Sequence, residues 1–249
     1  MTLARSNLAP STWSQILLDR RNPEEAAAAV RTGHVMPWTT VLLEACRAAD
    51  TVLDLGSGRG ELAAVLALNG KRVTLVDWSL ENLRFSRQLF KVLGISGRFC
   101  QADMTQPLPF RASSFDVVFS CGVLEFFSDR QIDLVLQESW RMCAYKLVVF
   151  VPNGLSFAYR FGKWYQERRG AWHWDGEVPF RTLRSYFAKL SGARVTEHSI
   201  APRHALSFLT MPVGKQVARL LQRALPSGGE SRPAFLRQGY LLVTTAERL

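Results

Sequence analysis

Short apolar runs rich in β-branched residues alternate with amphipathic segments from residue 50 onward. This alternation is typical of a parallel sheet whose strands are connected and covered by helices. The pattern therefore predicts an α/β domain. The expected strands are residues 51–55, 72–76, 97–101, 115–120, 147–151, 194–199 and 238–244.

Signals for helix ends lie between and before these strands. Ser79 can cap a helix over residues 80–93, and Gly94 can end it in a left-handed conformation. Pro23 and Pro37 suit the first turns of two helices that precede the sheet. Further helices are predicted at residues 60–69, 129–142, 179–190 and 204–225, the last one basic, amphipathic and interrupted near Pro212.

Positive charge is concentrated in the last two-fifths of the chain. Residues 151–249 hold 15 Lys and Arg against 6 Asp and Glu, whereas residues 1–150 hold 16 against 15. A basic half suggests an acidic partner, such as a phosphate- or carboxylate-bearing substrate, an anionic membrane surface or nucleic acid. A solvated basic face without a partner is the alternative. Residues 155–178 in this half show no clear period and are rich in aromatic side chains.

The remaining composition is that of an ordinary globular protein, with 47% hydrophobic and 21% charged residues. Residues 1–10 contain no apolar run suited to a signal peptide. The longest apolar stretch, residues 147–151, is far below the ~20 residues that span a bilayer. The four cysteines have neither metal-ligand spacing nor the density of a disulfide scaffold. We therefore expect a cytoplasmic protein with reduced thiols and no metal site.

A glycine-rich turn follows the first predicted strand, with the sequence Asp54-Leu55-Gly56-Ser57-Gly58-Arg59-Gly60. Glycines in that position let the backbone lie close to a ligand, and the helix that follows offers unpaired N–H groups. Asp77 ends the second strand, where a carboxylate can accept both hydroxyls of a ribose. Asp103 follows the third, where a carboxylate can accept from an adenine amine. Because carboxyl ends of neighbouring parallel strands face one crevice, these groups predict a nucleoside site.

These segments resemble the first four motifs of the class I S-adenosylmethionine-dependent methyltransferases, in order and at family spacing. The matching runs are residues 52–60, Val76-Asp77-Trp78-Ser79, Gln101-Ala102-Asp103-Met104 and residues 115–125. The resemblance covers about residues 50–155 and says almost nothing about the acceptor. It implies a three-layer Rossmann-like α/β fold with a mostly parallel seven-stranded sheet and a final antiparallel strand. It also implies S-adenosyl-L-methionine as cofactor and S-adenosyl-L-homocysteine as product.

The resemblance further implies contacts to the methionine part of the cofactor. Gly56 and Gly58 would let the backbone approach it, and Asp54 would lie beside its ammonium group. Ser120 and Cys121, at the end of the fourth strand, would supply backbone carbonyls to the same group. The residues placed near the cofactor carboxylate are Arg31 and His34.

Four residues are implied to hold the nucleoside. Asp77 would bind the ribose, and Trp78 would pack on the adenine ring. Asp103, together with the amide of Met104, would read the edge of the adenine. The alternatives are a core aromatic for Trp78 and a simple turn cap for Asp103.

Methyl transfer mainly requires in-line positioning of the acceptor's lone pair, with a base where the nucleophile carries a proton. Glu125 is one candidate catalytic residue. Many relatives have a Leu-Glu-His sequence at this point, whereas this chain has Phe126 in place of the histidine, which argues against a metal-assisted mechanism. Glu125 would line the acceptor pocket; a solvated loop carboxylate is the alternative.

His173 is the second candidate catalytic residue. It lies between Trp172 and Trp174, so a titratable group and stacking surfaces occur together, as an acceptor pocket requires. Packing is the alternative role for such an aromatic segment. His198 and His204 are further acid–base candidates.

We expect a single domain over residues 1–249. Residues 1–48 would form a helical cap, 49–152 the cofactor-binding core and 153–249 the acceptor-side half. The expected reaction is in-line methyl transfer to a small or medium-sized natural product, lipid or sugar-type acceptor, anionic acceptors included. Nucleic acid is disfavoured, because no Asn-Pro-Pro-Tyr-like tetrapeptide follows the fourth strand; peripheral membrane contact through the basic half is an option. The alternatives are a nicotinamide-dependent oxidoreductase and a non-catalytic S-adenosylmethionine-binding protein.

Overall fold

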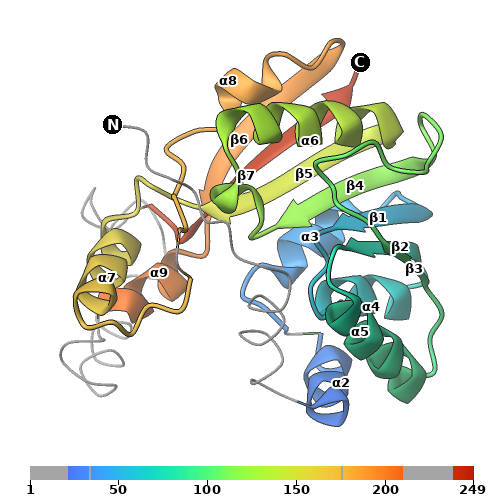
Figure 1. The fold of residues 1–249 in the computed structure, drawn as a ribbon, viewed down its shortest axis with the longest axis horizontal. Coiled ribbons are helices and arrows are strands. Elements are labelled where there is room, and N and C mark those ends of the chain that lie inside the picture. Colours follow the sequence, from blue (N-terminus) through green and yellow to red (C-terminus); the bar gives the residue numbers. More distant parts are fainter. Residues whose placement is uncertain (1–21, 34, 175, 210–237) are drawn as a thin grey trace.

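The fold is built on one seven-stranded sheet (Figure 1). The computed structural model describes residues 22–33, 35–174, 176–209 and 238–249. The strands are β1 (Thr51–Leu55), β2 (Arg72–Asp77), β3 (Arg98–Gln101), β4 (Phe115–Cys121), β5 (Cys143–Pro152), β6 (Ala193–Ile200) and β7 (Leu241–Arg248). The helices are α2 (Pro23–Arg31), α3 (Thr39–Ala45), α4 (Glu61–Leu68), α5 (Leu80–Leu93), the 3-10 turn η1 (Leu124–Phe126), α6 (Asp129–Met142), α7 (Phe157–Arg168), α8 (Arg184–Phe187) and α9 (Pro202–Leu209).

The strand order is β3-β2-β1-β4-β5-β7-β6. Strands β1 to β5 pair in parallel, whereas β7 is antiparallel to both β5 and β6. This confirms the expected three-layer Rossmann-like α/β fold with its final antiparallel strand. The strand order changes side between β1 and β4, and the carboxyl ends of β1, β2 and β4 meet at the crevice where such sheets bind ligands.

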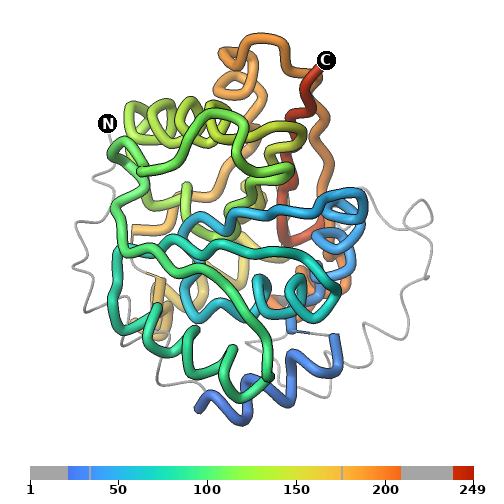
Figure 2. The backbone as a smooth tube through the Cα atoms, turned by 90° about the vertical axis from the view of Figure 1, so that its right-hand side faces the viewer, coloured from blue at the N-terminus to red at the C-terminus, as the bar shows by residue number. Residues whose placement is uncertain are grey.

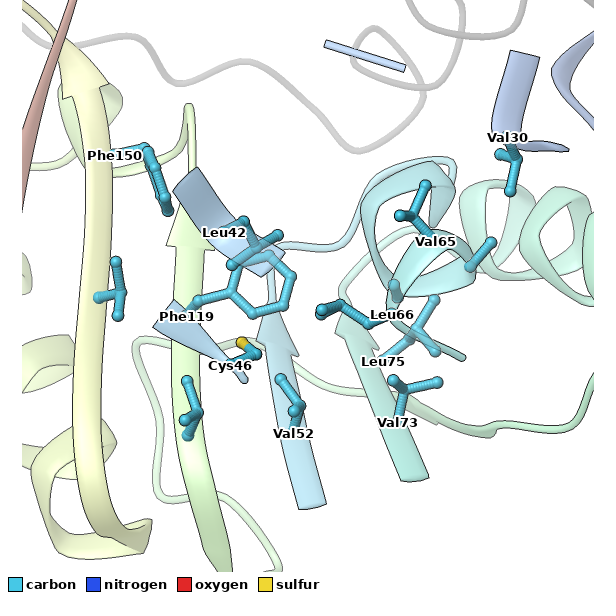
Figure 3. Packing of buried hydrophobic residues seen from close by; sticks show 14 of the residues in the cluster. Val30, Leu42, Cys46, Val52, Val65, Leu66, Val73, Leu75, Phe119 and Phe150 are labelled. Atoms are coloured by element: carbon cyan, nitrogen blue, oxygen red, sulfur yellow. The ribbon is translucent and has the colours of Figure 1, made fainter. Parts of the chain in front are cut away.

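Helices cover both faces of the sheet, and each face has its own hydrophobic core. One core joins α2, α3, α4 and α5 to the strands; in it Leu42 of α3 faces Phe119 of β4 and both are fully buried (Figure 3). The other core joins α6 and α8 to the opposite face through residues such as Leu53, Val118 and Phe187. The tube view shows α2 lying along the outside of α5 (Figure 2). Burial on both faces explains the almost unbroken apolar sequence of the central strands.

Several predicted elements are confirmed to the residue. Helix α5 spans residues 80–93, its N-cap Ser79 accepts from the Asn82 N–H, and Gly94 ends it at φ +69°. Helix α6 has the predicted bounds and a complete capping box. Pro23 opens α2, whereas the second helix begins at Thr39, two residues after the predicted Pro37.

The second half of the chain differs more from the prediction. Residues 157–168, where the sequence shows no clear period and no element was predicted, form helix α7. The helix predicted over residues 179–190 is reduced to α8, because Phe180 continues in extended form and exchanges backbone hydrogen bonds with Pro152 and Gly154. Strand β5 spans Cys143–Pro152 and is longer than predicted at both ends. It pairs with β4 from Cys143 onward and with β7 from Lys146 to Pro152. Only residues 202–209 of the predicted basic helix are described, and the remainder lies outside the described residues.

Helices α7 and α9 pack against each other beyond the carboxyl end of β5 (Figure 1). Their contact is close at Gly162, where an added Cβ would lie 2.6 Å from Cβ of Phe208. A larger residue at position 162 would therefore push the two helices apart. This helix pair forms one side of the crevice that opens at the strand ends.

Candidate functional site

A single continuous cavity of about 1440 Å³ lies at the carboxyl ends of β1, β2 and β4. One half is lined by the glycine turn after β1 and by the residues that follow β2 and β3. The other half is lined by η1, the segment after α7, and α9. Most of the predicted site residues therefore meet in one place, namely Asp54, Gly56, Gly58, Asp77, Trp78, Asp103, Met104, Cys121, Glu125 and His173.

The turn after β1 depends on glycine for two physical reasons. Gly56 and Gly60 have φ of +73° and +70°, a region that side chains with a Cβ rarely adopt. An added Cβ at Gly56 would also lie 2.6 Å from a methyl group of Val123, and one at Gly60 would lie 2.7 Å from Ser86 Oγ. The turn is thus packed tightly against the protein on its inner side.

Asp77 organises this turn as well as facing the cavity. Its Oδ2 accepts from the Gly58 N–H at 2.8 Å, and its Oδ1 accepts from the Ser79 N–H at 2.9 Å. Asn82 Nδ2 donates to the same Oδ1 at 3.4 Å. Burial raises the pKa of Asp77, although these three donors oppose the shift. A carboxylate has about four acceptor positions, so Asp77 can hold the turn and still accept from a ligand.

Asp54 is the most isolated charge of the site. Its side chain is only 4% exposed, and none of the described residues donates a hydrogen bond to its carboxylate. Burial, reinforced by the nearby negative charge of Asp77, raises the pKa of Asp54 well above its usual value. A cationic group in the cavity would relieve both effects.

The expected adenine-binding residues form the outer part of this half. Trp78 is 40% exposed, so its alternative role as a core aromatic does not apply. Asp103 is exposed, and its Oδ1 accepts from the N–H and the hydroxyl of Thr105 at 2.9 and 2.8 Å. These two bonds make Asp103 a turn cap, the alternative role considered for it. Its other oxygen, Oδ2, takes part in neither bond and can serve a ligand. Met104 is buried beside it.

Two buried carboxyl groups mark the other half of the cavity. Glu125 is 3% exposed, which excludes the solvated loop carboxylate as its role. Burial, and then the proximity of Glu177, raise the pKa of Glu125 well above its usual value. Glu177 is 7% exposed and accepts from the indole N–H of Trp172 at 3.1 Å. Burial raises the pKa of Glu177 despite the nearby Tyr159 hydroxyl and Lys163 amine.

Aromatic rings surround these carboxyl groups. His204 lies 5.1 Å from Tyr240, 5.6 Å from Phe208 and 5.9 Å from Trp38, measured between ring centroids. Burial lowers the pKa of His204 and so favours its neutral form. His173 also lines the cavity but is exposed. The aromatic segment after α7 thus faces the cavity, as an acceptor pocket requires.

Some predicted residues are not brought to the cavity. Arg31 donates to the Val92 carbonyl at 3.2 Å on the outer side of α5, because α2 packs along that helix. Ser120 is buried within β4 one residue short of the cavity, and His198 is exposed on β6. His34 lies outside the described residues. No group of side chains that could hold a metal ion occurs in the part of the chain that the structure describes.

Sequence reasoning missed Ser57, Glu177 and the aromatic ring of Tyr240. The Ser57 hydroxyl lines the cavity, is buried, and has no hydrogen-bond partner among the described residues. Its position between Gly56 and Gly58 was a usable signal. Glu177 gave no such signal, because its burial depends on α7 and on the return of the chain to β5.

Residues 52–145 match a family model described as a methyltransferase domain. No curated protein sequence matches the chain. A possible histamine N-methyltransferase from Thermotoga maritima has a similar fold, with a TM-score of 0.60 and 15% identity over 96% of this chain and 99% of that one. An S-adenosylmethionine-dependent methyltransferase from Archaeoglobus fulgidus gives 0.58 and 17% over 92% and 96%.

The magnesium protoporphyrin IX methyltransferase of Synechocystis, crystallised with bound S-adenosylhomocysteine, gives a TM-score of 0.56 and 16% identity over 89% of this chain and 86% of that one. At identities this low, the solved structures show a shared fold and nothing more. The matched methyltransferase domain runs from β1 to the start of β5, which is the region that holds the glycine turn and the acidic strand ends. Residues 52–145 are thus similar to a methyltransferase domain, and the Rossmann-like fold around them is the fold of S-adenosylmethionine-dependent methyltransferases.

Proposed function

We propose that the protein is an S-adenosylmethionine-dependent methyltransferase that acts on a small or medium-sized molecule, bound in the aromatic half of the cavity next to the methyl donor. The observation that carries the proposal is the continuity and size of the cavity. A pocket for one small ligand measures roughly 300–1,000 Å³, whereas this cavity measures about 1440 Å³ and has two differently lined halves. It therefore has room for a cofactor and for a second molecule beside it.

The half at the strand ends fits S-adenosylmethionine by its donor and acceptor set. The buried Asp54 carboxylate suits the ammonium group, and the buried hydroxyl of Ser57 suits a polar group of the methionine part. Asp77 would accept from the ribose hydroxyls, and the half-exposed Trp78 would cover the adenine ring. Asp103 would accept from the adenine amine through its second oxygen.

The bound cofactor supplies an electrophilic methyl group on a sulfonium. The protein's part is then to hold an acceptor in line with that methyl and to exclude water. Glu125, Phe126 and Tyr240 line the space where the acceptor would lie. Because two closely positioned reactants gain most of their rate from orientation, this lining can provide the main catalytic effect.

The charge of the cavity bears on the class of acceptor. Among the described lining residues, seven are Asp or Glu, and Arg59 is the one Lys or Arg. That lining favours a neutral or basic acceptor and gives no support to the anionic acceptor suggested by the basic second half of the sequence. A nucleic-acid acceptor is disfavoured by the same charge. No helix in the described residues is long and apolar enough to cross a membrane.

Two measurements test the proposal. Titration calorimetry with S-adenosylhomocysteine should give saturable binding, whereas a nicotinamide cofactor should give none. Incubation of the protein with methyl-labelled S-adenosylmethionine and a small-molecule fraction of a cell extract should yield a labelled small product. Label that appears only in protein or nucleic acid would refute the acceptor class.

A further inference from the structure

Glu125 and Glu177 lie on the acceptor side of the cavity, which no Lys or Arg among the described residues lines. Lys163 lies 3.7 Å from Glu177, but it also donates to Glu167 at 2.5 Å and does not line the cavity. Arg59 lies in the other half, where it pairs with Glu61 at 3.0 Å and stacks over the Phe85 ring at 4.5 Å. Within the described residues, the acceptor half therefore carries an excess of negative charge.

Glu125 also has an unused hydrogen-bonding atom. Its Oε2 is buried and has no hydrogen-bond partner among the described residues. Leaving a buried carboxyl oxygen unpaired is costly, and native proteins seldom do so without a functional reason. Because Glu125 lines the cavity, a donor on a bound molecule can reach this oxygen without entering the hydrophobic core.

The surroundings of Glu125 suit a cation with an apolar body. Phe126 follows it in the chain, and Trp172, Tyr240 and Phe208 line the same half of the cavity. Aromatic faces attract cations, and together with carboxylates they are a common way to bind an amine. An anionic molecule would meet Glu125 and Glu177, whereas the lysine that pairs with Glu177, Lys163, does not line the cavity.

We propose that the acceptor is a basic amine with an apolar or aromatic body, bound through its ammonium group to Glu125, which also takes the proton that must leave before methylation. This inference rests on the proposed function. Glu177 lies close enough to influence Glu125 and would hold the second side of the ammonium group.

The proton leaves the ammonium group before the methyl group is transferred. The ammonium N–H bond breaks, the proton moves to Glu125 Oε2, and the nitrogen regains its lone pair. The nitrogen then forms a bond to the methyl carbon, the carbon–sulfur bond breaks, and its electron pair stays on the sulfur. The product is a methylated ammonium, and the Glu125 proton returns to solvent when the product leaves. A carboxyl group whose pKa is raised by burial and by Glu177 is a competent acceptor for this proton.

The inference can be tested without knowing the natural acceptor. The full chain, saturated with S-adenosylhomocysteine, is titrated with 2-phenylethylamine, 2-phenylethanol and phenylacetate, which share one aromatic body and differ in charge. We expect the amine to bind at least about tenfold tighter than phenylacetate.

The matched variants are Glu125→Gln and the surface control Glu44→Gln, whose side chain is 65% exposed on α3. Glu125→Gln should lose the preference for the amine while retaining affinity for the alcohol. Glu44→Gln should behave as the unmodified chain. Equal or reversed preference, no measurable amine binding, or an unaltered preference in Glu125→Gln would overturn the inference. Failure of S-adenosylhomocysteine to bind at the start would instead refute the proposed function.

Discussion

The substitution Asp77→Asn tests whether Asp77 holds the glycine turn as well as the cofactor. The two carboxylate oxygens accept from the Gly58 and Ser79 N–H groups. An asparagine side chain has one oxygen and one NH2 group, so one of these backbone donors would face another donor. The turn should therefore be destabilised even in the absence of any ligand.

The magnitude follows from the hydrogen bonds that are lost. A buried donor left unpaired costs about 1–3 kcal/mol, and the weakened second bond adds to this. Part of the loss is offset, because burial already disfavours the ionised form of Asp77 and raises its pKa. We expect the free energy of unfolding to fall by about 2–3 kcal/mol. In a chain of this length that corresponds to a melting temperature lower by roughly 4–12 °C.

The assay is thermal or urea unfolding of the ligand-free protein, combined with titration of S-adenosylhomocysteine. Amide hydrogen exchange at Gly58 should become faster in the variant, since its N–H loses an acceptor. If stability and exchange are unchanged while affinity falls, Asp77 is solely a ligand-binding residue and the reasoning about the turn is wrong. If affinity is unchanged, Asp77 does not contact the cofactor.

Three further substitutions separate the roles of the remaining residues. Trp78→Ala should weaken S-adenosylhomocysteine binding by about 1–2 kcal/mol with little loss of stability, because the ring is 40% exposed; unchanged affinity in calorimetry would remove Trp78 from the site. Glu125→Gln should become more stable relative to the unmodified chain as pH rises above about 4.5, by up to about 1.4 kcal/mol per pH unit. The reason is that the folded-state pKa of Glu125 is raised, so the unmodified chain loses stability between the unfolded and folded pKa values of this group. Denaturant unfolding that gives parallel stability profiles against pH for the two proteins would contradict this. His173→Ala should reduce turnover and leave cofactor affinity intact, and full turnover in a methyl-transfer assay would assign His173 to packing.

The cofactor half of the molecule was predictable because its signals are local. A strand, a glycine turn and a helix follow one another within 51–68, and each acidic residue stands at or just beyond the end of its own strand. The direction of parallel strands then places Asp54, Asp77 and Asp103 at one edge of the sheet. No long-range information is needed for that step.

The acceptor half was less predictable because its structure depends on contacts between distant segments. In α7, Phe157 and Trp164 are about half exposed while Ala158 and Tyr159 are buried, so apolar residues occur on both sides of the helix and hide its period. Phe180 looked like part of a helix, but its backbone is bound to residues after β5. Arg31 was assigned by family position alone, whereas the packing of α2 on α5 decides its actual place.

The position of β7 has a consequence for how the molecule forms during synthesis. Residues 241–248 lie in the interior of the sheet, between β5 and β6, although they are the last strand in the sequence. Among the described strands β6 pairs with β7 alone, so it can join the sheet only after those residues have been made. The cofactor core can therefore assemble early, while the chamber for the second molecule is completed only after β7 has been made.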